Sequence, residues 1–242
     1  MNTKTAMCIF ALATTPTAFG SLILSSANFV SGTGLGTEPT LLTIQNSPNE
    51  IGCVGATSNQ TGSTFNASGV CTGSSADVKT GASQIGPQAI GTITANTFGI
   101  VFNADQSAGG PITLADLKAS FYDSTGRFLY ETSGLSCAVA GNTLCSFLTT
   151  ASGVGKSGYL FVLDAAQQQA ATTAGAFTSP NNIVGLSASA VGGNAGPETF
   201  YLANVGGGSG VPLGTAPEPS TLMFAAAGMV LLGLGKLNRS RR

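Results

Sequence analysis

The segment Leu117-Lys118-Ala119-Ser120-Phe121-Tyr122-Asp123-Ser124-Thr125-Gly126-Arg127-Phe128-Leu129-Tyr130-Glu131 gives the clearest indication of the fold. Leu117, Ala119 and Phe121 alternate with Lys118, Ser120 and Tyr122, which is the period of a half-buried strand. The residues from 123 to 126 have the composition of a turn, and a second strand-like run follows them. The segment therefore predicts a β-hairpin.

Similar signals recur on both sides of this hairpin. Phe98, Ile100 and Phe102 alternate with Gly99, Val101 and Asn103. Further strands are expected near residues 41–45, 88–94, 144–149, 159–163, 183–190 and 199–203. Residues 165–171 are good helix formers that follow the potential cap Asp164, so one short helix is expected there. The pattern predicts an all-β fold, a single antiparallel β-sandwich of jelly-roll type with one short helix, and a barrel is the alternative.

The composition favours an exported β-protein. Only 8% of the residues are charged, whereas 43% are hydrophobic and the chain has 34 glycines. Disordered chains are usually richer in charge, so an ordered middle is expected. The basic residues of that middle are few: Lys79, Lys118, Arg127 and Lys156. Without a basic patch to neutralise phosphates, binding to nucleic acid is not expected.

Four cysteines follow the leader, at Cys53, Cys71, Cys137 and Cys145. An even number in an exported chain suggests two disulfides, and four cysteines allow three pairings. We favour Cys53–Cys71 and Cys137–Cys145, because each pair brackets a loop rich in small polar residues between expected strands. A zinc site is not expected, since the spacing lacks a Cys-x-x-Cys pair and the chain has no histidine.

The absence of histidine also excludes Ser-His-Asp and Cys-His catalysis. Asp116 and Asp123 flank one expected strand, but their odd spacing places them on opposite faces. Residues 153–157, Gly-Val-Gly-Lys-Ser, are similar to the end of a P-loop. Thr150 stands where the first glycine of that motif belongs, and a strand is expected after it instead of a helix, so a turn is the better interpretation. No catalytic residue, cofactor or metal ligand is expected.

Two alternatives to a structural role remain open. Tyr122, Tyr130, Tyr159 and Tyr201 are candidates for a sugar-binding surface, although tyrosines in alternating strands are more often cross-strand partners. A concave face with clustered acids or exposed tyrosines would favour a polysaccharide-binding module. Two carboxylates that converge in a pocket would favour the third possibility, a carboxylate-based hydrolase.

The N-terminus has the layout of a secretory signal peptide over residues 1–27. A weakly positive start with Lys4 precedes an apolar run from 6 to 13, and small residues follow. Two cleavage sites fit this pattern, after Gly20 in Ala18-Phe19-Gly20 or after Ala27 in Ser25-Ser26-Ala27. The pattern does not decide between them.

The C-terminus has three parts. Pro217-Glu218-Pro219 comes first, an apolar run from 222 to 235 follows, and Lys236, Arg239, Arg241 and Arg242 end the chain. A helix from 220 to 237 would be roughly 27 Å long, close to the thickness of a hydrocarbon core of about 30 Å. The basic end should stay cytoplasmic. A membrane-spanning helix is therefore expected here.

This tripartite pattern resembles the PEP-CTERM sorting tail of exported bacterial proteins. Pro217, Glu218 and Pro219 match its motif, and Arg239, Arg241 and Arg242 match its basic end. The resemblance implies an exosortase-type enzyme as a processing partner, with cleavage near the motif and release or re-anchoring. It covers about a tenth of the chain and implies nothing about the activity of the middle, because such tails occur on many unrelated domains.

We therefore expect four parts: a signal peptide (1–27), a β-sandwich domain (28–205), a glycine-rich linker (206–216) and a sorting tail with a transmembrane helix (217–242). The protein is expected to pass through the inner membrane as an anchored precursor and to reach the cell surface or the extracellular matrix. A structural or adhesive role without enzymatic activity is the leading hypothesis, and matrix polysaccharide is a possible partner.

Overall fold

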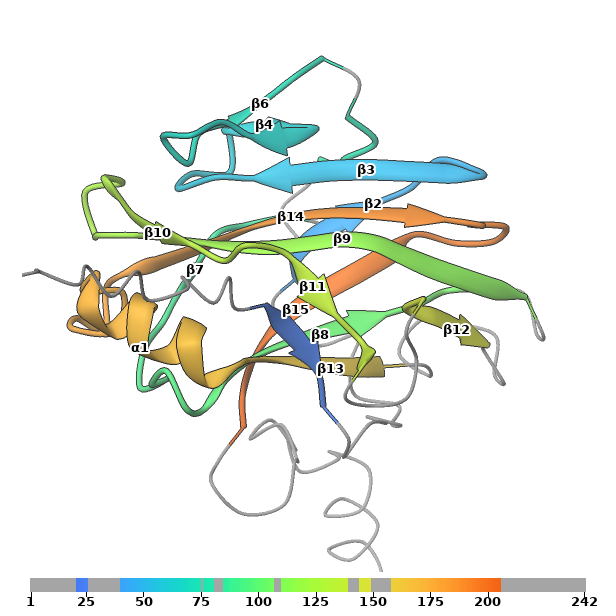
Figure 1. The fold of residues 1–242 in the computed structure, drawn as a ribbon. Coiled ribbons are helices and arrows are strands. Elements are labelled where there is room, and N and C mark those ends of the chain that lie inside the picture. Colours follow the sequence, from blue (N-terminus) through green and yellow to red (C-terminus); the bar gives the residue numbers. More distant parts are fainter. Residues whose placement is uncertain are drawn as a thin grey trace, which may run out of the picture.

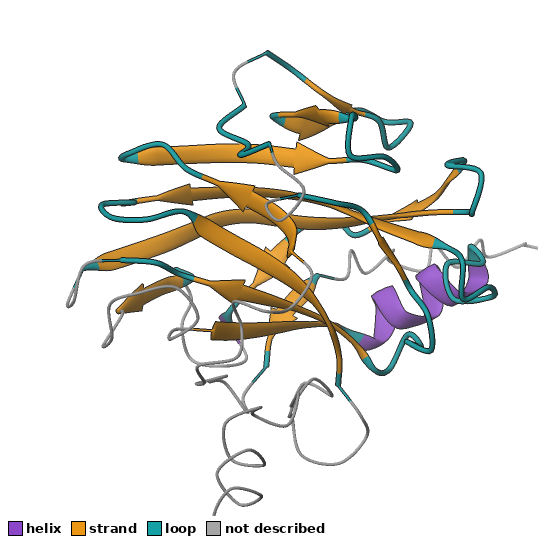
Figure 2. Cartoon of the chain, turned by 180° about the vertical axis from the view of Figure 1, so that it is seen from behind, coloured by secondary structure: helices purple, strands orange, loops and turns teal. Residues whose placement is uncertain are grey.

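The computed structural model describes residues 21–25, 40–74, 76–80, 85–106, 110–138, 144–148 and 158–205. Most of the leader, the turn expected at 153–157, the linker and the sorting tail lie outside these residues. Within the described part of the chain the fold is mostly β, as expected, with largely antiparallel sheets and one short helix (Figures 1 and 2). No helix among the described residues is both long enough and apolar enough to cross a membrane.

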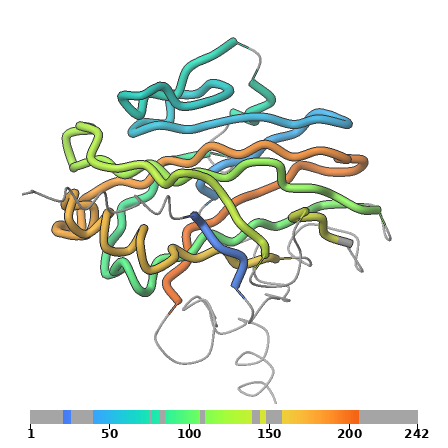
Figure 3. Tube along the Cα trace, viewed as in Figure 1, coloured from blue at the N-terminus to red at the C-terminus, as the bar shows by residue number. Residues whose placement is uncertain are grey.

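One large sheet has six strands in the order β11-β1-β13-β8-β15-β2. Neighbouring strands in this sheet run antiparallel, except for β1 and β11, which run parallel. The strands, in sheet order, are β11 (Leu135–Ser136), β1 (Leu22–Leu24), β13 (Gly158–Leu163), β8 (Phe98–Asn103), β15 (Glu198–Asn204) and β2 (Thr40–Ile44). The N-terminal strand β1 thus lies between two segments from the second half of the chain (Figure 3).

The other large sheet has seven strands, with β10-β9-β14-β3-β4 as its main path, while β12 pairs with β9 and β7 pairs with β14. Its strands are β10 (Phe128–Glu131), β9 (Pro111–Tyr122), β14 (Ile183–Val191), β3 (Asn49–Val54), β4 (Thr61–Gly62), β12 (Ser146–Leu148) and β7 (Gln88–Ala89). β5 (Thr64–Phe65) and β6 (Cys71–Thr72) form a separate two-stranded sheet.

The hairpin predicted from the sequence is present as β9 and β10. The carboxylate of Asp123 organises its turn by accepting hydrogen bonds from the backbone N–H groups of Thr125 and Arg127, at 2.9 and 3.0 Å. The Thr125 hydroxyl and Arg127 hold the pKa of the Asp123 carboxyl well below its ordinary value. Asp123 is therefore a turn residue, and Asp116 pairs with Lys118 at 3.7 Å on the strand.

The core is built from side chains of both large sheets. Phe98 of β8 packs against Phe121 of β9, with ring centroids 5.2 Å apart. Phe102 stacks on Phe200 at 5.1 Å. Full burial of each such side chain contributes about 1.5–3 kcal/mol to the hydrophobic stabilisation.

The six-stranded sheet is buried on its other face as well. Val101 alternates with Ile100 and Phe102, and it packs with Leu160 and Tyr201 in a second, smaller apolar cluster. All six residues of β8 are buried. The alternating side chains of this strand therefore point to two buried faces, and neither face is exposed to solvent.

The short helix is also present, as α1 (Ala165–Thr173). Asp164 caps it by accepting a hydrogen bond from the backbone N–H of Gln167 at 2.8 Å. The strand expected at 88–94 is shorter than predicted, because the chain turns at Gly91, where φ is +61°. The N–H of Ile90 still donates to the Asn182 carbonyl at 2.8 Å, in register with the β7–β14 ladder, and the N–H of Gly91 then donates to the Pro180 carbonyl at 2.9 Å.

Candidate functional site

The cysteines form the two disulfides expected from the sequence, Cys53–Cys71 and Cys137–Cys145. Their Cα atoms lie 5.8 and 5.3 Å apart, within the usual range. The first disulfide ties β3 of the seven-stranded sheet to β6 of the small sheet. Because these four thiols are oxidised, they do not serve as metal ligands.

The tyrosines do not form an exposed platform. Tyr122 and Tyr201 are buried, and Tyr130 and Tyr159 are half-buried. The Tyr122 hydroxyl donates to the Gly69 carbonyl, and the Tyr130 hydroxyl donates to the side chain of Gln167. Burial, with the nearby charge of Asp164, raises the pKa of Tyr130 to about 12. All four tyrosines therefore act as packing residues within the fold.

Among the described residues, the most unusual polar feature is a pair of buried carboxyl groups that no sequence pattern indicated. Glu50 lies near the start of β3, and Glu198 is the first residue of β15 in the other large sheet. Glu50 is 3% exposed and Glu198 is fully buried. The two carboxyl groups lie close enough for each to influence the pKa of the other. Glu50 Oε2 and Glu198 Oε2 are buried and have no hydrogen-bond partner among the described residues.

A shell of polar groups encloses this pair. The Gln106 amide donates to Glu198 Oε1 at 2.6 Å, and Gln106 in turn accepts from the N–H of Asn194 at 3.1 Å. Gly193 lies directly against Glu50, and a Cβ at this position would overlap Glu50 Oε1. The Ser47 hydroxyl holds the same loop by donating to the Gly193 carbonyl at 2.7 Å.

The electrostatics of the pair follow from its burial. Burial raises the pKa of Glu198, and the facing carboxyl of Glu50 raises this pKa further. Burial also raises the pKa of Glu50 above its ordinary value. Two like charges in contact are unfavourable in a dry site, so the pair holds at least one proton near neutral pH.

The pair has the two carboxyl groups of an acid–base dyad, but neither group is accessible to a substrate. Catalysis requires the reacting groups to contact a substrate, and both carboxyl groups are enclosed by protein. Within the described residues, no group of three or more acidic or cysteine side chains is arranged to bind a metal ion. One carboxyl group comes from each of the two large sheets, so the pair is a buried polar contact between them.

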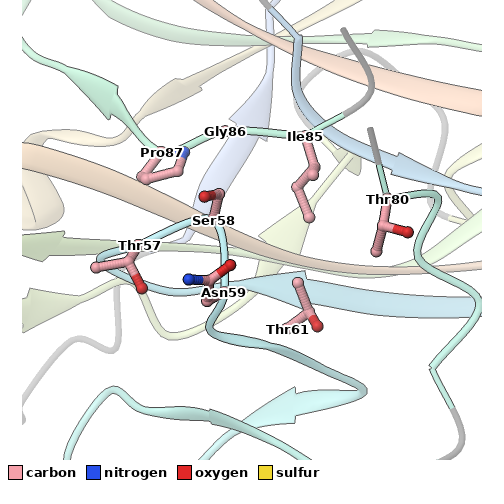
Figure 4. A pocket seen from close by; sticks show the side chains of 8 residues that line it. All are labelled: Thr57, Ser58, Asn59, Thr61, Thr80, Ile85, Gly86 and Pro87. Carbon is pink, nitrogen blue, oxygen red and sulfur yellow. The ribbon is translucent and has the colours of Figure 1, made fainter. Parts of the chain in front are cut away.

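A second candidate site is a polar hollow of about 780 Å³ beside the β3–β4 turn (Figure 4). Its lining consists of Thr57, Ser58, Asn59, Thr61, Thr80, Ile85, Gly86 and Pro87. These side chains offer hydroxyl and amide groups but no charge and no aromatic ring. A lining of this kind suits a neutral, hydroxyl-rich ligand.

Local hydrogen bonds fix one wall of this hollow. The N–H of Gln60 donates to the Thr57 carbonyl at 2.9 Å and closes the turn. The side-chain oxygen of Gln60 accepts from the N–H of Ala56, also at 2.9 Å. Thr57, Ser58 and Asn59 are thereby presented at the tip of the turn, and all three are exposed.

The residues assigned to the sorting motif, Pro217, Glu218, Pro219, Arg239, Arg241 and Arg242, lie outside the described residues. No protein-family model, curated protein or solved structure matches the chain.

Proposed function

We propose that this protein is an exported, exosortase-sorted protein of the cell surface or extracellular matrix, with a structural or adhesive role. In this proposal the two large sheets form a single jelly-roll-like sandwich. The tail anchors the precursor in the inner membrane until an exosortase-type enzyme processes it.

The observation that carries the proposal is the pair of disulfides. Disulfides persist in oxidising compartments and are rare in the cytosol of mesophiles. Both lie inside the fold, since Cys53 is fully buried and the other three cysteines are at most 6% exposed. They therefore support a folded state reached outside the cytoplasm, and the tripartite tail supports the route.

A structural role agrees with the chemistry of the described residues. Their most unusual polar groups, Glu50 and Glu198, are enclosed by protein and lie against each other. The four tyrosines are used in packing. What remains at the surface is largely uncharged, as the low charged fraction of the chain already indicated.

The test is to produce the full chain in a bacterium with and without an exosortase. We expect the protein to be released from the membrane, or transferred to the cell surface, only when the enzyme is present. A triple variant, Pro217→Ala with Glu218→Ala and Pro219→Ala, should remain in the membrane fraction as precursor. Pro212→Ala is the matched control, because it removes a proline of the linker but keeps the motif. Equal processing of the triple variant would contradict the proposal.

The polar hollow at the β3–β4 turn supports a second candidate function, binding of a neutral polysaccharide. In a co-sedimentation assay with matrix polysaccharide, Asn59→Ala should weaken binding, since its amide lines the hollow. Asn181→Ala is the control, because Asn181 is an exposed turn residue outside the hollow. Equal binding by both variants would contradict this function.

A further inference from the structure

The position of the first described strand bears on where the leader is removed. Residues 22–24 form β1, which pairs with β13 on one side and with β11 on the other. The N–H of Leu22 donates to the Gly134 carbonyl at 2.8 Å, and the N–H of Ser25 donates to the Leu160 carbonyl at 2.9 Å. β1 is therefore an inner strand of the six-stranded sheet.

The side chains of β1 belong to the main core. Leu22 is fully buried and Leu24 is 4% exposed, and both are members of the cluster that includes Phe161. Cleavage after Ala27 would remove this strand with the leader. The core would lose two leucines, and β11 and β13 would each lose a neighbour. Cleavage after Gly20 would keep the strand complete.

The residue that follows Gly20 already faces an acidic partner. The backbone nitrogen of Ser21 donates to Asp164 Oδ2 at 2.5 Å. The other oxygen of the same carboxylate, Oδ1, accepts the N–H of Gln167 and caps α1. An ammonium group at Ser21 would therefore lie beside a carboxylate that the fold holds in place.

We propose that a signal peptidase cleaves the bond between Gly20 and Ser21, and that the new α-ammonium group of Ser21 forms an ion pair with Asp164. This inference rests on the proposal that the protein is exported. Hydrolysis consumes one water, leaves a carboxylate on Gly20, and leaves an amine on Ser21 that takes up a proton. Ala18 and Gly20 supply the small residues that such an enzyme requires before the cleaved bond.

The experiment is to express the full chain with its leader in an exporting bacterium and to determine the N-terminus and intact mass of the exported product. A product that begins at Ser21 supports the inference. A product that begins at Asn28, or at any other residue after the leader, overturns it but leaves export intact. Retention of the leader on protein that stays in the cytoplasm overturns both proposals.

Two variants sharpen this test. Gly20→Leu places a large side chain before the proposed bond, and it should abolish the product that begins at Ser21. Residue 20 leaves with the leader, so this loss does not reflect a misfolded mature domain. Ala27→Leu alters the rival site and should leave cleavage at Ser21 unchanged. Loss of processing in Ala27→Leu, with normal processing in Gly20→Leu, would overturn the inference.

Discussion

The carboxyl groups of Glu50 in β3 and Glu198 in β15 lie against each other although they come from different sheets, and both residues are at least 97% buried. Because burial raises the pKa of Glu198, the folded state keeps a proton that the unfolded chain releases above about pH 4.5. The contribution of this proton to the free energy of unfolding is fully present below that pH. It declines as the pH rises toward the raised pKa of the folded state.

Glu198→Gln should flatten this pH dependence. Glutamine keeps a hydrogen-bonding side chain of the same size without the ionisable proton. The free energy of unfolding of the variant should therefore fall less steeply with pH than that of the wild type, and the two slopes should differ by about 1.4 kcal/mol per pH unit for one proton. Urea denaturation at several pH values from mildly acidic to alkaline measures the slope. Asp116→Asn, which changes a partly exposed acid, serves as the control. Parallel curves for wild type and Glu198→Gln would contradict a raised pKa of Glu198 in the folded state.

Gly185→Ala should destabilise the seven-stranded sheet. Gly185 lies in β14, where a Cβ would overlap the backbone carbonyl oxygen of Val54. Because backbone does not move aside as a flexible side chain does, we expect a loss of about 1–3 kcal/mol in thermal or urea unfolding. Gly86→Ala is the matched control, since only the end of the Gln88 side chain lies within 4 Å of its added Cβ. Equal stability of the two variants would show that β14 and β3 are less closely apposed.

Gln167→Ala should loosen the contact of α1 with the sheet. The buried side chain of Gln167 accepts the Tyr130 hydroxyl and donates to the Ser133 hydroxyl at 2.9 Å. Removal of such a buried polar partner costs about 1–3 kcal/mol. Gln169→Ala, on the exposed side of the same helix, should change the unfolding free energy little. Hydrogen exchange in α1 distinguishes local loosening from global destabilisation, and unchanged exchange in Gln167→Ala would contradict the role.

The two disulfides should contribute unequally. Cys53–Cys71 closes the longer loop, with a sequence separation of 18 against 8 for Cys137–Cys145. The chain-entropy model assigns about 3 kcal/mol to the longer loop and about 2.5 kcal/mol to the shorter one. Double alanine variants of each pair, compared by urea unfolding, should lose stability in that order. The reverse order would show that the native contacts of the shorter loop dominate its contribution.

The elements that could be predicted from the sequence are those whose residues all lie within one short stretch of the chain. The β9–β10 hairpin has both strands and its turn within one short stretch, and α1 follows its own cap at Asp164. β3 was not predicted, because Glu50 and Gly52 interrupt its apolar pattern. Tertiary contacts explain both residues, since Glu50 meets Glu198 and Gly52 packs against Ile44 and Val78.

The pair of buried carboxyl groups could not be predicted from the sequence for a related reason. Neither Glu50 nor Glu198 carries a local motif, and because they lie in different sheets, only the tertiary arrangement brings them together. A lone glutamate at the start of a strand is normally a solvated residue. The cysteine pairing was predictable because each partner lies near the other in sequence, so local loop closure favours the observed bridges.

The same pairing bears on the order in which the protein matures. Each disulfide joins cysteines that are consecutive among the four of the expected mature chain. If the chain is exported as we propose, and crosses the membrane from its N-terminus, Cys53 and Cys71 emerge before either cysteine of the second pair. A thiol oxidase that joins cysteines as they emerge produces the native bridges directly. On this proposed route, the native pairs form with an oxidant alone, without an isomerase to reshuffle wrong pairs.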